Sequence, residues 1–207
     1  MIELFKLKPG VEHFLPHEET DVRPCYDVFD IYGLGLADVD LSNAPYIPFR
    51  MPGSPMARTD LPLGASFFLL MTPRLLHLLE SLGDFPHQVI PAHLVPDRDD
   101  WRDHPPIDTT SFVVCNLHQH LHIVDFARSV LTPYEVEDGM RRMDQLVAID
   151  GVTMPPLFRQ ANWPLSPLIP VSTRDAILAA GMLDVFMPPL QGNMIRLSDI
   201  RPPSLQR

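Results

Sequence analysis

The sequence has few cysteines and no apolar run long enough to span a membrane, and each absence excludes a class of protein. Only two cysteines, Cys25 and Cys115, occur in 207 residues, so a disulfide scaffold is excluded. Stretches without a charged side chain, such as 61–73 and 160–173, are shorter than the roughly 20 apolar residues that cross a bilayer. No apolar block follows Glu3, so the N-terminus does not have the pattern of a secretory signal. We therefore expect a cytoplasmic protein with no membrane partner.

Acidic residues outnumber basic ones, and the excess is uneven along the chain. The sequence has 26 acidic and 16 basic residues, a formal net charge of −10. Residues 1–66 contribute −5, residues 67–150 contribute −7, and residues 151–207 contribute +2. A surface this acidic repels phosphate backbones, which argues against a nucleic-acid partner and favours a basic protein partner. Solubility alone is the alternative reason for such a charge.

Proline is abundant, with 24 residues, and its positions predict short elements joined by proline-rich connections. Thr72 followed by Pro73, with leucines at helical spacing and Gly83 as terminator, predicts one helix. Ser172 as N-cap and Gly181 predict a second. The sequence favours an α+β fold with a mixed or mainly antiparallel sheet. A proline-rich stretch before residue 61 suggests a small N-terminal strand and loop layer (1–60) on a core domain (61–207).

Strand-like segments occupy most of the remaining chain. They are bounded by Pro, Gly, Asp or Asn, and the clearest are Glu3–Leu7, Val89–Val95, Phe112–Val124 and Leu146–Ile149. The segment 132–135 is typical of either a capped helix start or a strand, and the sequence leaves both open.

Three histidines at alternate positions offer one candidate metal site. On a continuous strand, His118, His120 and His122 lie on one face and together bind zinc or iron. Asp125 would lie on the opposite face, and no second metal-ligand motif occurs elsewhere in the sequence. The alternative is a polar sheet face or a hairpin tip, so no cofactor is expected.

Patterns for other enzyme chemistry are missing. The sequence has no Gly-x-Ser-x-Gly elbow, and Gly33-Leu34-Gly35 lacks the third glycine and basic side chain of a phosphate-binding loop. Cys115 lies in the middle of an apolar strand, where burial raises the pKa of a thiol. We expect a protein that is not an enzyme.

The best local candidate for partner binding is a charged loop around a tryptophan. Four carboxylates surround this aromatic side chain in residues Asp97, Asp99, Asp100, Trp101 and Asp103. An aromatic anchor with charges at its rim is typical of interface hot spots, although a solvated loop is the simpler interpretation. A second acidic stretch, residues 12–40, has eight acidic residues against Arg23 alone.

The order of segments between Phe67 and Pro188, roughly 120 residues, resembles the immunity protein 11 family of bacterial polymorphic toxin systems, formerly a domain of unknown function. The matching segments follow in series: 68–76, 113–117, Val124-Asp125 with Ser129, 146–150, 157–159, Val171-Ser172, then Gly181 and Phe186. The chain departs from the family where Leu183-Asp184-Val185-Phe186 replaces a glycine followed by phenylalanine. The histidines fall in a stretch that varies within the family, and residues 1–66 lie outside the resemblance.

The resemblance implies an intracellular protein that binds a cognate toxin domain and blocks it without chemistry of its own. Two alternatives remain at this point. One is a metal-dependent enzyme that uses His118, His120 and His122, and the other is a scaffolding module without a toxin partner. The sequence does not indicate the oligomeric state.

Overall fold

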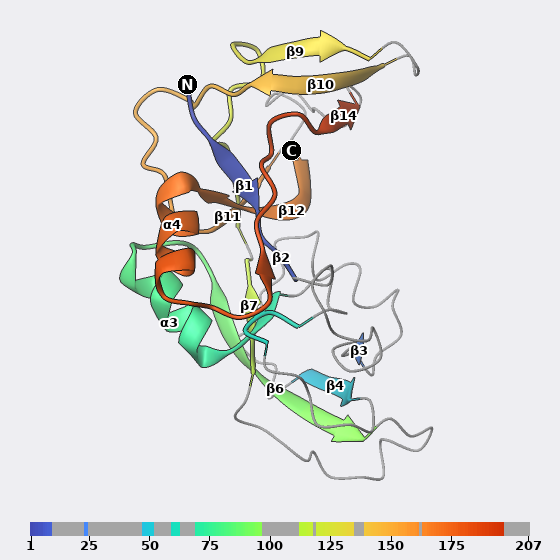
Figure 1. Ribbon diagram of the computed structural model, residues 1–207, viewed down its shortest axis with the longest axis vertical. Helices are drawn as coiled ribbons and strands as arrows, with labels where there is room; N and C mark the ends of the chain where they lie inside the picture. The colour runs from blue at the N-terminus through green and yellow to red at the C-terminus, as the bar shows by residue number, and fades with distance from the viewer. Residues whose placement is uncertain are drawn as a thin grey trace.

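The fold is α+β, with short helices and mostly antiparallel sheets, as predicted from the sequence (Figure 1). The structure is a computed structural model that describes residues 1–9, 23–24, 47–51, 59–62, 69–96, 112–117, 119–134, 139–161 and 163–196. Its helices are α3 (Pro73–Ser81) and α4 (Val171–Ala179). Its strands are β1 (Leu4–Lys6), β2 (Lys8–Pro9), β3 (Arg23–Pro24), β4 (Ile47–Met51), β5 (Leu69–Met71), β6 (Gln88–Pro96), β7 (Val113–Asn116), β8 (His120–Leu121), β9 (Val130–Pro133), β10 (Met140–Gln145), β11 (Phe158–Gln160), β12 (Trp163–Pro170), β13 (Val185–Phe186) and β14 (Met194–Arg196).

A four-stranded sheet in the order β1-β12-β11-β8 separates two hydrophobic clusters. Neighbouring residues of one strand belong to opposite clusters, because successive side chains point to opposite faces of the sheet. Leu4 belongs to one cluster and Phe5 to the other, and Leu168 and Ile169 divide in the same way. All four side chains are at most 4% exposed. A sheet covered on both faces explains why these strands have consecutive apolar residues rather than alternating ones.

The second large sheet has the order β3-β4-β6-β7-β5. The β4–β6 pair is parallel and the other pairs are antiparallel. Helix α3 joins the same hydrophobic cluster as β5 and β7, through residues Leu69, Met71, Leu75, Leu76, Leu79 and Cys115. The predicted start of α3 is confirmed, because the Thr72 hydroxyl accepts a hydrogen bond from the Leu75 N–H at 3.3 Å and Pro73 opens the helix.

Helix α4 begins two residues earlier than predicted, at Val171. Pro170, not Ser172, occupies the N-cap position, with an extended backbone (ψ 167°) and no side-chain capping bond. Its fixed φ ends strand β12 and leads directly into the helix. Ser172 therefore lies inside the first turn, and the predicted N-cap role for it is wrong. Gly181 follows the helix with a φ of 61°, a left-handed conformation that glycine adopts without a steric cost.

A third sheet, β14-β10-β9, lies at one end of the molecule, and β4 and β6 lie at the other (Figure 1). The segment 132–135, which the sequence left open, begins as strand: β9 includes Thr132 and Pro133 and pairs antiparallel with β10. The predicted strand 146–149 is reduced to isolated bridges, Ile2 to Leu146 and Val124 to Ala148.

Residues 1–9 contribute two strands and three buried side chains, Leu4, Phe5 and Leu7, to the fold. β1 pairs with β12, and β2 pairs with β13. Residues 59–62 are also buried, with Leu61 only 1% exposed. Most of residues 10–58 lie outside the described residues, so a domain boundary near residue 60 stays a prediction.

Candidate functional site

The acidic loop predicted as the partner site lies outside the described residues. This applies to Asp97, Asp99, Asp100, Trp101 and Asp103. The structure does describe the strand that precedes it. β6 ends at Pro96 beside Met51 of β4, and the preceding pair is Val95 with Arg50.

The second acidic stretch, 12–40, is joined to the same region of the fold. Arg23 of β3 pairs with Arg50 of β4, and Arg50 in turn pairs with Val95 of β6. Adjacent strands lie about 4.8 Å apart, so the backbone at Arg23 and at Val95 is separated by about 10 Å. Asp21 and Asp97 each lie two positions from one of these residues along the chain. The two acidic sequences therefore join the sheet at neighbouring strand positions.

The net negative charge comes from residues outside the described part of the chain. The described residues carry nine acidic and eleven basic side chains, a formal charge of +2. The other residues therefore carry −12, and the two parts sum to the net charge of −10. Sequence reasoning found the charge excess, but it did not show that the described residues are close to neutral.

The continuous strand that would align the three histidines is not present. The chain from Phe112 to Val124 divides into β7, in the five-stranded sheet, and β8, in the four-stranded sheet. His120 is half-buried in β8 opposite Arg159 of β11, whereas His122 is exposed and follows the strand. His118 lies outside the described residues. The shared face predicted from strand parity is therefore wrong, because parity carries no information across a break between two sheets.

The Cys115 thiol is buried and protonated at neutral pH. It is 1% exposed, and burial, followed by the negative charge of Glu80, raises its pKa to about 12. This confirms the predicted direction. Glu80 also lies 3.2 Å from Nε2 of His87, whose ring stacks on Phe85. A nucleophilic cysteine needs a thiolate, and both burial and Glu80 oppose its formation.

Two polar side chains of β11, Arg159 and Gln160, are buried, and sequence reasoning did not identify them. Arg159 is 2% exposed, and desolvation lowers its pKa to about 10. The neighbouring Gln160 is fully buried, and its Oε1 accepts hydrogen bonds from the N–H groups of Ile123 and Val124 at 3.0 and 2.9 Å. These bonds hold the chain after β8 against the sheet. A polar pair directly after Leu157 and Phe158 is the only signal that could have indicated buried polar groups at this position.

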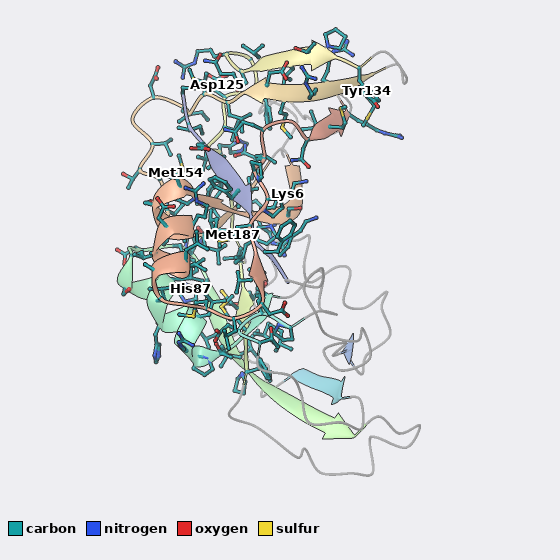
Figure 2. The ribbon with its side chains drawn as sticks, in the orientation of Figure 1. Lys6, His87, Asp125, Tyr134, Met154 and Met187 are labelled. Carbon is teal, nitrogen blue, oxygen red and sulfur yellow. The ribbon has the colours of Figure 1, made fainter. Side chains whose placement is uncertain are left out.

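Three residues from the resemblance, Asp125, Ser129 and Asp150, meet in one hydrogen-bonded turn. Asp125 lies toward the end of the molecule that carries β9 and β10 (Figure 2). Its Oδ1 accepts from the N–H groups of Ala127 and Arg128, and its Oδ2 accepts from Arg128 Nε at 2.7 Å. These bonds lower the pKa of Asp125.

The same turn is fixed to the following segment. Arg128 Nη1 donates to Asp150 at 3.0 Å, and Arg128 Nη2 donates to the Ala148 carbonyl at 2.9 Å. The Ser129 hydroxyl donates to the Asp125 carbonyl and accepts from the Val147 N–H. The structural role of these residues is therefore to connect the turn 125–129 with residues 146–150.

Within the described ranges, no group of three or more His, Cys, Asp or Glu side chains is arranged to hold a metal ion. Neither helix of the described residues has the length and apolar character that a membrane crossing requires. In comparisons with known proteins, no protein-family model and no curated protein matches this chain.

Proposed function

We propose that this protein is a cytoplasmic immunity protein that binds a cognate bacterial toxin domain and neutralises it by non-covalent occlusion. The partner in this proposal is a basic protein. The protein itself performs no chemistry, and neither a cofactor nor a nucleic acid takes part. The proposal rests on the resemblance to the immunity protein 11 family and on the distribution of charge.

The charge distribution is the observation that carries the proposal. The described residues carry a formal charge of +2 and the other residues carry −12, so most of the acidic residues that would attract a basic partner are among the latter, which include Asp97, Asp99, Asp100 and Asp103. Charges placed in this way increase the association rate and orient the encounter. Solubility alone does not require the acidic residues to be concentrated in a few segments.

The residues that carry the resemblance have structural roles within the fold. Phe158 is buried in the core, and Asp125, Ser129 and Asp150 form the hydrogen-bonded turn. A side chain that is committed to packing or to internal bonds is a poor anchor for a partner. We therefore assign these residues to the fold, and we assign partner recognition to the acidic segments.

Our preferred interface is the loop with Asp97, Asp99, Asp100, Trp101 and Asp103. Within the second acidic stretch, 12–40, Arg23 of β3 pairs with Arg50 of β4, and Arg50 also pairs with Val95 of β6, the strand that precedes the loop.

The first test is functional. The open reading frame next to this gene is co-expressed with and without the protein in a bacterial host. The proposal predicts that the neighbouring protein is toxic alone and harmless when the two are co-expressed. A neighbouring gene that is not toxic, together with the absence of any toxin-like gene in the same operon, would instead favour the scaffolding module.

The second test measures binding kinetics with a matched pair of charge variants. One variant replaces Asp97, Asp99, Asp100 and Asp103 with amides. The control replaces Glu3, Asp84 and Asp175 with amides and Leu178, which is 63% exposed, with lysine, and so changes the net charge equally. We expect the loop variant to slow association with the toxin much more than the control does.

The salt dependence of the association rate tests electrostatic steering, and the Trp101→Ala variant tests whether the tryptophan is a hot spot of the interface. Association should slow as salt rises, because the Debye length falls from about 10 Å at 0.1 M to about 3 Å at 1 M. Trp101→Ala should weaken binding by about 2 kcal/mol or more, mainly through faster dissociation. Equal effects of the two charge variants, with wild-type affinity for Trp101→Ala, would show that the loop is not the interface.

A further inference from the structure

A short buried segment, residues 59–62, connects the preceding chain to both helices, and we call it the strap. All four residues are buried. Leu61 belongs to the same hydrophobic cluster as Leu75 and Leu79 of α3. The Leu61 N–H donates to the Thr59 hydroxyl at 3.1 Å, which fixes the turn of the strap.

Asp60 uses its backbone and both carboxylate oxygens to join the strap to two distant segments. Oδ1 accepts from the Thr72 hydroxyl at 2.6 Å, and Oδ2 accepts from the Leu183 N–H at 2.7 Å. The Asp60 N–H donates to the Leu183 carbonyl, and the Asp60 carbonyl accepts from the Thr72 N–H. The residue is 5% exposed. One buried carboxylate therefore bonds to the N-cap of α3 and to the chain just after α4.

The carboxylate also sets the orientation of the helix cap. A hydroxyl has one proton, and Thr72 donates it to Asp60. A lone pair of Thr72 Oγ1 is then left for the Leu75 N–H at 3.3 Å. Without the carboxylate, the Thr72 proton has no fixed direction, and the cap of α3 is weakened.

Arg74 completes the connection from the side of α4. One end of its guanidinium lies 3.6 Å from Asp60 Oδ2. The other end donates to the carbonyls of Ala180 and Gly181 at 2.6 and 3.2 Å. These carbonyls close the end of α4, where a cation is favoured by the helix dipole. Arg74 is thus shared between Asp60 and α4.

We propose that Asp60 is a latch that makes the strap, the start of α3 and the end of α4 open as one cooperative unit. A displacement of the strap breaks the cap of α3 and the contacts after α4 in the same step. The strap is one described link between the earlier part of the chain and the helices; another is β1, whose Phe5 ring centre lies 4.3 Å from the guanidinium carbon of Arg174 in α4. The inference uses only the framework and does not depend on the identity of a partner.

Hydrogen exchange of the full-length protein tests the latch. In Asp60→Asn, amides at the start of α3 and amides of residues 180–184 should exchange faster by a similar factor of about ten or more, since bonds to a charged group are lost. Amides of β9 and β10 should keep their wild-type rates. Asp175→Asn, which removes an exposed carboxylate from α4, should leave all of these rates unchanged.

A second variant tests the coupling if Asp60→Asn folds poorly. Arg74→Gln changes a side chain that is 54% exposed and retains the bond between Asp60 and Thr72. It should accelerate exchange in both helix segments by a smaller, shared factor. Faster exchange in only one of the two helix segments would show that the contacts of Asp60 are independent. Equally faster exchange throughout the protein would show that Asp60 contributes only to global stability. Either result overturns the latch.

Discussion

Alkaline pH should destabilise the protein through the Cys115 thiol, and replacing this residue with alanine isolates the effect. The pKa of this thiol is about 12 in the folded protein, whereas the ordinary pKa of a cysteine thiol, which applies to the unfolded chain, is 9.0. Above pH 9 the unfolded state loses the proton and the folded state keeps it. The stability that this group contributes is complete below pH 9 and is lost as pH rises from 9 toward 12.

The size of the effect follows from this difference in pKa. Linkage gives a loss of about 1 kcal/mol at pH 10 and about 4 kcal/mol once pH exceeds 12. Arg159 acts in the opposite direction, since its pKa falls from 12.5 to about 10 in the folded protein and its deprotonation restores stability between these values. Measurements between pH 8 and pH 10 are therefore dominated by Cys115.

Urea unfolding followed by circular dichroism at pH 7, 8, 9 and 10 measures the effect. Both proteins carry Cys25→Ser, so that Cys115 is the only thiol in the reference protein. At pH 7 the reference should be more stable than Cys115→Ala, because the variant loses buried volume. This difference should shrink by about 1 kcal/mol by pH 10. A difference that stays constant from pH 7 to pH 10 would refute the reasoning, because the thiol would then titrate alike in both states.

Three further predictions concern the core, a helix cap and the histidines. Leu4→Ala should cost about 3 kcal/mol in urea unfolding, because Leu4 is fully buried in β1, whereas Met1→Ala, at an 89% exposed position, should cost almost nothing. Thr72→Ala should cost about 1 kcal/mol or more in the same assay, because the cap of α3 is lost and Asp60 loses a donor; an unchanged midpoint would contradict the cap geometry. Elemental analysis of the purified protein should find no stoichiometric zinc or iron, and metal that disappears when His118, His120 and His122 are all changed to alanine would favour the enzyme alternative.

Local patterns predicted the elements that depend on neighbouring residues. The α3 boundaries follow from Thr72, Pro73 and Gly83, which act within one or two turns of the helix. The strand predicted at 89–95 is present as β6, and the strand predicted at 3–7 is present as β1. The fold class followed from the spacing of prolines, which limits the length of helices.

Features that depend on distant contacts were not predictable in the same way. Nothing near Phe112 or Val124 shows that the segment between them divides between two sheets. The burial of Arg159 depends on the surrounding strands, and the role of Asp60 depends on Leu183, which lies 123 positions away. For the candidate site, the acidic loop stays a prediction from the sequence, whereas the position of its preceding strand, β6, beside β4 required the fold.

The internal bonding of the framework limits where a partner can be recognised. Asp125 and Asp150 bond to Arg128, Asp144 bonds to Arg142 and Thr132, and Asp60 bonds to Thr72 and Leu183. A partner that competes for these carboxylates must break internal bonds, and the cost of breaking them reduces the binding energy. In the proposed function, the acidic loop and the acidic stretch 12–40 attract the basic partner. The strand that precedes the loop, β6, and the strand within the stretch, β3, lie on either side of β4 in one sheet.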